Sequence, residues 1–271
     1  MSKTRIAILI LAAGKSTRVA KVISGRQKCG EKIYVPFIGT EKPAIQYQIE
    51  FARHIIDTIE KPVEADIYVV VGYRSQDVIR WLKPYSDRIT VIFDTEIQGI
   101  ANVWRRFTEK TCTKLWFGSE CICDYDIVIS INGDDIHNID VAWELGKHIE
   151  MFIDRGGKMT IDGIVAVAEH PYAKNKSVYL VNEKNLVTRI WEKAEMMSDK
   201  LYIGTGIYVI KMDWLPQVKY KKNKETGEIE PGDILNQMIK KGAKIYLYIH
   251  KIDKWLDIGN PNIMEKLRKE G

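Results

Sequence analysis

An apolar run near the start of the chain, Thr4–Leu11, leads directly into a loop of small and basic residues, Leu11–Arg18. The run has the composition of a strand buried on both faces. In the loop, Gly14 lets backbone N–H groups approach phosphate oxygens closely, and Lys15 and Arg18 add fixed positive charge. The spacing is neither that of a P-loop nor that of a dinucleotide-binding turn. A buried strand ending in such a loop predicts an α/β fold that handles phosphate groups.

Strand-like and helix-like segments alternate through the first half of the chain. Apolar runs of strand length occur at 4–12, 67–71, 89–93, 127–131 and 161–168, and apolar residues recur at helical spacing in 43–60, 75–82, 101–107 and 141–153. This order predicts a doubly wound, mostly parallel sheet with right-handed crossovers. Ligands bind beyond the carboxyl ends of the strands in such sheets, where the loops at 13–18 and 132–135 would both lie.

The second half has a different pattern. It predicts strands at 178–181, 186–191, 202–210 and 245–250, with helices at 231–241 and 261–269. Because few helices separate these strands, we expect a smaller antiparallel portion packed on the same sheet. The polar residues 219–231 are expected to form an exposed excursion, and 109–123 an irregular insertion. No repeat or long linker interrupts the sequence, so we expect one domain over residues 1–271.

The charge balance limits the classes of partner. The chain has 41 Lys and Arg against 36 Asp and Glu, a net charge of 41 − 36 = +5. This mild excess suits anionic small molecules and does not require nucleic acid. The densest basic run, Lys219–Lys224, is more typical of a solvated loop than of a nucleic-acid contact. No apolar run approaches the roughly 20 residues of a membrane span. We therefore expect no nucleic-acid and no membrane partner, and the oligomeric state stays open, a homo-oligomer included.

The four cysteines are expected to be ordinary reduced thiols. A chain of 271 residues can bury enough core to fold without disulfides, which favours a cytoplasmic protein. Cys112, Cys121 and Cys123 lie close together in the sequence. Zinc sites usually need four ligands in paired spacing, and this cluster has a C-x-C pair without an evident fourth ligand. We expect neither a metal site nor a redox switch here.

Two acidic motifs carry the clearest chemistry. Asp134 follows a buried strand and is a candidate Mg²⁺ ligand, with Asp135 and His137 as neighbours that can assist. A turn followed by a helix N-cap explains the same residues equally well. Asp257 lies in Trp255–Pro261, just before the last predicted helix, where a capping role is the alternative. Two carboxylates from distant parts of a chain can hold one Mg²⁺ and leave positions for phosphate oxygens and water.

Together these motifs resemble those of the sugar-phosphate nucleotidylyltransferase family. The loop Leu11–Arg18 is similar to the family signature L-[AG]-[AG]-G-x-G-[ST]-R, with Ser16 in place of its third glycine. Further similar segments follow in the family's order over nearly the whole chain: Glu31–Pro36, Lys42–Pro43, Val71–Tyr73, Gln98–Ala101, Asn132–Asp134, Glu192–Lys193, Gly204–Tyr208 and Trp255–Gly259. Each similarity is weak alone, and their common order makes the resemblance specific.

The resemblance implies transfer of NMP from an NTP to a sugar-1-phosphate, which gives an NDP-sugar and pyrophosphate, with Mg²⁺ as cofactor. It implies a Rossmann-like sheet in which residues 1–155 mainly bind the nucleotide and the antiparallel portion within 156–271 mainly binds the acceptor. Arg18, Lys32 and Asp134 would be catalytic, and Asp134 and Asp257 would hold the metal. The other implied contacts are Leu11, Ala12, Ala13, Gly14, Lys15, Gln98, Gly99 and Gly133 to the nucleotide, and Glu192, Lys193, Gly204 and Thr205 to the acceptor.

Two features of the sequence complicate this assignment. In the family the catalytic lysine follows the Arg by about ten residues, and this spacing from Arg18 points to Lys28. The distance to Pro36 instead favours Lys32, with a small insertion over 22–30. Lys32 ranks first and Lys28 stays open. Glu192 and Lys193 follow a predicted strand, whose alternation would point them to opposite sides. A twist or bulge at 191–193 is therefore needed if both are to reach one ligand.

Two other functions remain open. The first is a cytidylyltransferase that acts on a non-sugar phosphomonoester, such as an alcohol or amino-alcohol phosphate. The similarity of Glu192–Lys193 and Gly204–Gly206 to the sugar side of the family argues against it. The second is a non-catalytic, nucleotide-sensing regulatory subunit on the same fold. Retention of Arg18, Asp134 and Asp257 argues against that function.

Overall fold

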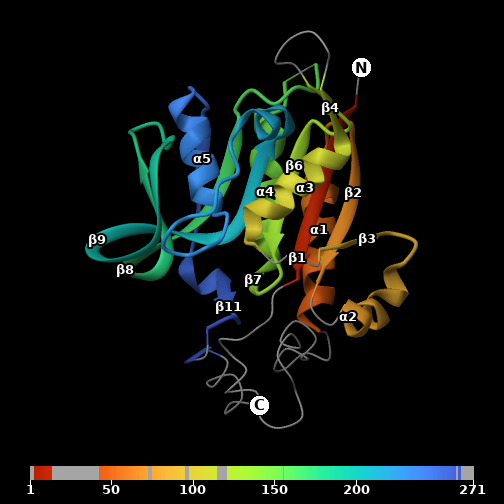
Figure 1. Cartoon of the computed structure of the whole chain (residues 1–271), viewed down its shortest axis with the longest axis horizontal. Helices are drawn as coiled ribbons and strands as arrows, with labels where there is room; N and C mark the ends of the chain where they lie inside the picture. The colour runs from red at the N-terminus through yellow and green to blue at the C-terminus, as the bar shows by residue number, and fades with distance from the viewer. Residues whose placement is uncertain are drawn as a thin grey trace.

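A seven-stranded mixed sheet forms the centre of the molecule (Figure 1). A computed structural model of the chain describes residues 3–13, 43–72, 75–94, 98–114, 121–154, 156–260 and 262–263. The strand order is β10-β8-β9-β6-β1-β2-β3. The strands of this sheet are β1 (Thr4–Ala12), β2 (Val63–Val71), β3 (Thr90–Phe93), β6 (Ile127–Asn132), β8 (Gly163–Val181), β9 (Val187–Lys211) and β10 (Ile245–His250). Strand β9 runs antiparallel to both of its neighbours, and the other pairs are parallel.

Helices cover both faces of the sheet. On one face lie α1 (Ala44–Thr58), α2 (Ser75–Leu82) and α4 (Ile139–Phe152), and on the other lie α3 (Ile100–Thr111), α5 (Pro231–Lys240) and the 3₁₀ helix η2 (Met212–Gln217). Alternate residues of β1 divide between the two cores: Ile6, Ile8 and Ile10 pack in the first, and Ala7 and Leu9 in the second. Because both faces are covered, β1 has the continuous apolar composition of a strand in a doubly wound α/β sheet.

Most elements of the first half agree with the sequence prediction. The predicted strand at 4–12 and helix at 75–82 have the bounds of β1 and α2, and the helix predicted at 43–60 is α1. Strand β2 begins four residues earlier than predicted, at Val63, because its first half alternates exposed and half-buried residues and lacks a continuous apolar run. Helix α3 also runs further than predicted, to Thr111. The helix predicted at 261–269 lies mostly outside the described residues.

The antiparallel portion is built from two long strands. Separate strands were expected at 161–168, 178–181, 186–191 and 202–210, but the structure joins them into β8 and β9, whose pairing contains several register shifts. Both strands continue past the sheet as a bent arm (Figure 1). The prediction failed because residues 192–200 on this arm are mostly exposed and polar, so their hydrophobic pattern is weak.

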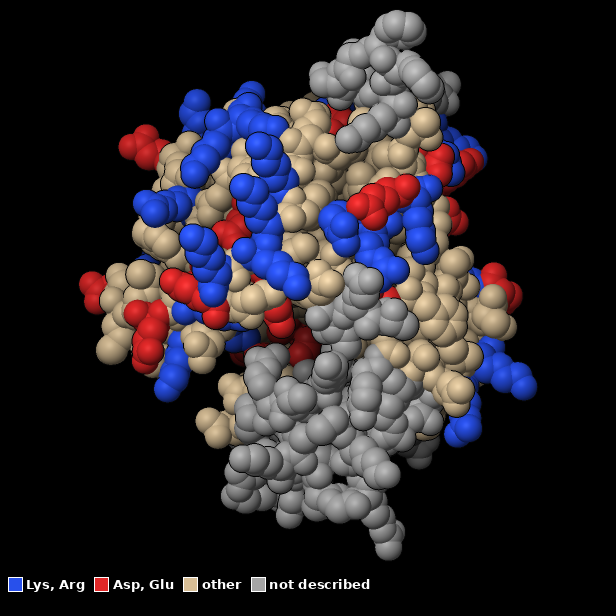
Figure 2. Space-filling model, viewed as in Figure 1, with Lys and Arg blue, Asp and Glu red and all other residues tan. Residues whose placement is uncertain are grey.

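The segment between η2 and α5, residues 218–230, contains neither helix nor strand. Its lysines at 219, 221, 222 and 224 are exposed, in agreement with a solvated surface. Figure 2 shows positive side chains gathered on the face viewed, with acidic side chains among them. The described part of the chain contains no helix that is long and apolar enough to cross a membrane.

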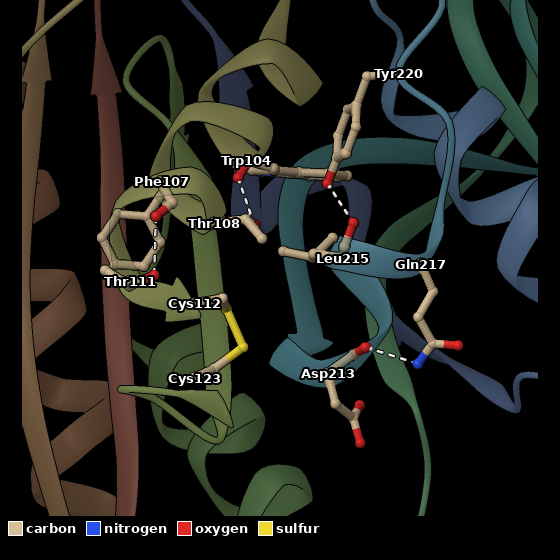
Figure 3. Close-up of a disulfide and its surroundings, with 10 residues drawn as sticks. All are labelled: Trp104, Phe107, Thr108, Thr111, Cys112, Cys123, Asp213, Leu215, Gln217 and Tyr220. Carbon is tan, nitrogen blue, oxygen red and sulfur yellow. Dashed lines mark hydrogen bonds between the residues drawn. A yellow bond between two sulfur atoms is a disulfide. The ribbon is translucent and has the colours of Figure 1, made fainter. Parts of the chain in front are cut away.

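An irregular insertion with reduced cysteines was expected over 109–123, and both expectations are wrong for its described residues, 109–114 and 121–123. Two short strands, β4 (Cys112–Lys114) and β5 (Cys121–Cys123), pair antiparallel with Cys112 opposite Cys123. These two cysteines form a disulfide, with Cα atoms 4.0 Å apart (Figure 3). Cys121 is free and half-buried. The reason is cross-strand register, which brings together residues 11 apart in the sequence.

Candidate active site

The carboxyl ends of β1 and β6 lie side by side. The Gly133 N–H donates to the Leu11 carbonyl over 3.0 Å, so the turn after β6 rests on the end of β1. A Cβ at position 133 would collide with that carbonyl, which explains the glycine. The predicted nucleotide contacts at Leu11, Ala12, Ala13 and Gly133 therefore share one edge of the sheet. Gly14, Lys15, Arg18, Lys28 and Lys32 lie outside the described residues.

Contacts from several elements hold the turn at 132–135. The buried Gln48 side chain of α1 donates to the backbone carbonyls of Asp135 (2.6 Å) and Asn132 (3.3 Å). Within the turn, Asn132 Nδ2 donates to Asp135 Oδ2 over 2.9 Å. This pair packs on the backbone of Gly206, which has a φ of 82° and no room for a side chain. The carboxylate of Asp135 is thus a structural element of the turn.

Asp134 and Asp257 come together through a short antiparallel pair. Strand β7 (Asp135–His137) pairs with β11 (Trp255–Asp257), which places Asp257 opposite Asp135. The Ile258 N–H donates to the Asp134 carbonyl over 2.9 Å. Asp134 is half-buried and Asp257 is buried. The fold therefore brings the two predicted metal ligands to the same place from positions 123 residues apart, 257 − 134.

Negative charge accumulates at this place. Burial, together with the charges of Asp134 and Asp257, raises the pKa of Asp135 to about 7. The charge of Lys176 and the hydrogen bond from Asn132 oppose this rise in the pKa of Asp135. Trp255 Nε1 donates to Asp135 Oδ1 over 2.9 Å. Lys176 also donates to Asp257 Oδ2 over 2.6 Å.

The donor chemistry suits a hard divalent cation. Asp134 and Asp257 supply carboxylate oxygens, and the accumulated negative charge around Asp135 favours a cation. Among the described residues no group of three or more His, Cys, Asp and Glu side chains is arranged as a metal site. Any cation held here would therefore need ligands beyond these two carboxylates, such as phosphate oxygens and water.

His137, named in the sequence as a neighbour that can assist, is part of the core. Its ring packs against Phe51 and His250, each with centroids 5.5 Å away. Neither ring nitrogen has a hydrogen-bond partner among the described residues. Burial, followed by the nearby His250, lowers the pKa of His137 to about 3. The side chain is therefore neutral near pH 7 and packs in the core.

A bulge carries Glu192 and Lys193, as the sequence analysis required. Lys176 pairs with Ala194 and Val178 pairs with Trp191, so two residues of β9 stand opposite the single Ser177 of β8. Lys193 itself has a φ of 47°, in the left-handed region. The extra residue breaks the alternation of β9.

The side chains of Glu192 and Lys193 both contact residues 230–232, where α5 (Pro231–Lys240) begins. Glu192 Oε1 accepts from the Gly232 N–H and Oε2 accepts from Ser177 Oγ, each over 2.5 Å. Burial and the nearby Glu230 raise the pKa of Glu192, although these hydrogen bonds oppose the rise. Lys193 Nζ lies 3.1 Å from Glu230 Oε1.

The predicted acceptor contacts at 204 and 205 differ in placement. Thr205 is fully buried, and its hydroxyl bonds to the Ala166 carbonyl (3.1 Å) and His250 Nε2 (2.9 Å). Its side chain therefore serves the core between β8, β9 and β10. Gly204 packs against the ring of Tyr179.

The predicted base contacts, Gln98 and Gly99, precede α3. The Gln98 carbonyl accepts from the Ile229 N–H over 2.8 Å. Ile229 is therefore next to the base-side turn, and Glu230 and Gly232, one and three residues later, contact the bulge. This short segment connects the two predicted halves of the substrate site.

The described candidate residues therefore form one connected region. Sequence analysis missed several of its members, among them Glu230 and Gly232. Gln48 is hidden among the apolar residues of α1, and Ser177 and Lys176 lie in a stretch without a recognisable motif. Polar residues buried on an otherwise apolar helix face, like Gln48, were the one signal available in advance.

Comparison with known proteins shows the family to which the chain belongs. The pattern of the nucleotidyl transferase family matches residues 7–270. The chain belongs to this family. A nucleotidyl transferase is an enzyme that uses a nucleotide substrate, and the resemblance inferred from the ordered motifs is thereby confirmed.

Individual relatives of this nucleotidyl transferase are distant. The chain is 24% identical over 253 residues to the bifunctional protein GlmU of Acholeplasma laidlawii. The match covers 90% of this chain and 46% of GlmU, so the chain spans about half the length of that relative. Its fold is similar to a putative glucose-1-phosphate thymidylyltransferase from Bacillus anthracis (TM-score 0.69, 18% identity, 97% and 94% of the two chains). It is also similar to the inositol-1-phosphate CTP transferase from T. maritima (TM-score 0.64, 17% identity, 99% and 96%).

Proposed function

We propose that this nucleotidyl transferase transfers NMP from an NTP to a sugar-1-phosphate, giving an NDP-sugar and pyrophosphate. The acceptor phosphate oxygen attacks the α-phosphorus, a bond forms there, and the bond to the leaving pyrophosphate breaks. The observation that carries the proposal is the connected region itself. It joins the end of β1, the carboxylates Asp134 and Asp257 and the bulge Glu192–Lys193.

Each part of this region has a role in the proposal. Asp134 and Asp257 hold a divalent cation, Mg²⁺, which when bound neutralises charge on the phosphates. Lys193 leaves Glu230 to pair with the acceptor phosphate, and Glu192 accepts from acceptor hydroxyls. Gln98 and Gly99 contact the base. Arg18 and Lys32 stabilise the triphosphate and the leaving pyrophosphate.

A second acceptor class is supported by a specific observation. Both oxygens of Glu192 are already bonded within the protein, to Gly232 and Ser177. These bonds occupy part of the acceptor capacity that a sugar hydroxyl would need, whereas a phosphomonoester whose phosphate pairs with Lys193 makes no demand on Glu192. The similarity in fold to an inositol-1-phosphate CTP transferase makes a cytidylyltransferase acting on a non-sugar phosphomonoester the alternative.

A pyrophosphate-release screen tests both. Each NTP is combined with a panel of sugar-1-phosphates, inositol phosphate and alcohol phosphates, in Mg²⁺ and in EDTA. The proposal expects the fastest release with a sugar-1-phosphate and none in EDTA. Faster release with a non-sugar phosphomonoester supports the alternative. If nucleotides bind but no acceptor gives release, a nucleotide-sensing role replaces both.

A further inference from the structure

Lys176 contacts a candidate metal ligand that the sequence motifs do not connect with it. Its Nζ lies 2.6 Å from Asp257 Oδ2 and 4.6 Å from the centroid of the Trp255 ring. The Lys176 side chain is 26% exposed and that of Asp257 is 8% exposed. A partly buried ion pair of this kind is screened less than one on the surface.

The position of the ammonium is built by three separate segments. Lys176 belongs to β8 and pairs with Ala194 beside the bulge. Trp255 of β11 donates its indole N–H to Asp135 Oδ1, which fixes the ring. The ring face then supports the ammonium against Asp257 by a cation–π contact. The backbone of β8 and the Trp255 ring are thus held by contacts that do not involve the Lys176 side chain.

A divalent cation and Lys176 would compete for Asp257. The Oδ1 atom of Asp257 accepts from the Gly259 N–H over 2.8 Å, so Oδ2 is the oxygen paired with the lysine. Two cations at one carboxylate in a partly buried place repel each other strongly. The ammonium therefore has to leave Oδ2 before a metal ion can take it.

We propose that Lys176 is a displaceable counter-ion that closes Asp257 to free divalent cations and yields it when the cation arrives with the nucleotide. The phosphates of the nucleotide bring the negative charge that offsets the repulsion between the two cations. Lys176 is then a positioning residue, because it acts on the metal through Asp257. This inference rests on the proposed function in one respect: it takes Asp257 as a metal ligand.

Direct metal binding tests the inference without an activity assay. Free Mn²⁺ is followed by electron paramagnetic resonance during titration of the full chain, without nucleotide and then with non-hydrolysable α,β-methylene analogues of the NTPs. Lys176→Met removes the charge and keeps most of the side-chain stem, and Lys176→Arg keeps the charge. The matched control is Lys174→Met, an exposed lysine on the same strand. Asp257→Asn removes the carboxylate charge.

Without nucleotide, Lys176→Met is expected to bind Mn²⁺ about tenfold more tightly than the unaltered chain, because a competing charge is gone. Lys176→Arg and Lys174→Met are expected to bind as the unaltered chain does. The increase in Mn²⁺ affinity caused by the nucleotide analogue should shrink in Lys176→Met, since the lysine no longer has to be displaced.

Two outcomes are distinguishable. If Asp257→Asn weakens Mn²⁺ binding but a folded Lys176→Met does not tighten it, the counter-ion role is wrong and the metal assignment stands. If Asp257→Asn binds Mn²⁺ as the unaltered chain does, the metal assignment in the proposed function fails, and with it the inference. Lys176→Gln replaces Lys176→Met if circular dichroism shows that the methionine variant does not fold.

Discussion

The bonds that hold the turn carrying Asp134 end mostly on the backbone of the turn, whereas at the bulge the side chains of Glu192 and Lys193 are themselves bonded. The turn is fixed by the Gly133 N–H on the Leu11 carbonyl and by the Ile258 N–H on the Asp134 carbonyl. At the bulge, the Glu192 carboxylate and the Lys193 ammonium are themselves the bonded groups.

This difference separates two ways of building a site. Because these bonds end on the backbone of the turn, a ligand of the Asp134 carboxylate would not have to break them. At the bulge, a ligand competes with contacts that the same side chains already make within the protein. We therefore expect the backbone of the carboxylate region to be preformed and to tolerate little change, with only the Lys176–Asp257 ion pair exchanging, and the bulge to adapt to its acceptor.

The largest effect is expected at the preformed region. Asp134→Asn or Asp257→Asn should each lower turnover by about 100-fold or more, because a charge that holds the cation is lost. Steady-state pyrophosphate release measures this, with the exposed Asp253→Asn as the matched control. Turnover within a few-fold of the unaltered chain in either variant would contradict the assignment.

A smaller and more selective effect is expected at the bulge. Lys193→Ala should raise the KM for the phosphorylated acceptor by about tenfold and change the KM for NTP little, because one charge-assisted contact to the acceptor is lost. Its ion pair with Glu230 is partly exposed, so stability should hardly change. Lys184→Ala, at an exposed position of the β8–β9 turn, is the control. Equal changes in both KM values would place Lys193 outside the acceptor site.

The disulfide joins β4 to β5 in a third region, at the end of the molecule opposite β7 and β11 (Figure 1). Replacing Cys112 and Cys123 with Ser should lower the free energy of unfolding by about 2 kcal/mol, since a loop closure is lost. Turnover should not change, because the hairpin precedes β6 while Asp134 follows it. Urea denaturation and pyrophosphate release measure the two quantities, with Cys121→Ser as control. Loss of turnover on reduction would give the disulfide a functional role.

The support of the turn can be tested apart from its carboxylates. Gln48→Leu should cost about 1–2 kcal/mol of stability and lower turnover, because the buried Asp135 carbonyl loses its donor. Gln46→Leu, half-buried on the same helix, is the control. Ser177→Ala removes a donor from Glu192 at the bulge and should affect turnover less. If Ser177→Ala lowers turnover more than Gln48→Leu, the contrast between a rigid turn and an adaptable bulge is wrong.

The smallest expected effect is a pH dependence of stability in EDTA. The folded-state pKa of His137 is lowered to about 3, so the unfolded chain binds more protons and stability falls as pH drops below about 6.5. The pKa of Asp135 is raised to about 7, so its contribution is present at low pH and is lost as pH rises through 7.

Between about pH 4 and 6.5 these two slopes oppose each other. His137→Phe removes the first slope and fills a site next to Phe51. Its unfolding free energy should therefore rise by about 1 kcal/mol between pH 7 and about pH 5.7, relative to the unaltered chain. Urea denaturation at the two pH values measures this. A parallel pH profile in the variant and the unaltered chain would show that His137 is not the acid-sensitive group.

Much of the fold follows from local patterns. The continuous apolar runs of β1 and β6 and the helical spacing of α1 and α2 identify buried elements without any knowledge of their partners. The order of strand and helix then restricts the sheet to a doubly wound arrangement. The same local logic places Asp134 at the carboxyl edge, and it anticipates that a bulge is needed at Glu192–Lys193.

Tertiary structure decided what depends on pairing between distant segments. The antiparallel insertion of β9 between β6 and β8, the register that joins Cys112 to Cys123 and the approach of Asp257 to Asp134 are not encoded in any local period. Lys176 shows this best. Nothing around it in the sequence marks it, and only the packing of β8 against β11 brings its charge to Asp257. The sequence alone determines which residues can carry charge or be buried, and long-range contacts determine which of those charges meet.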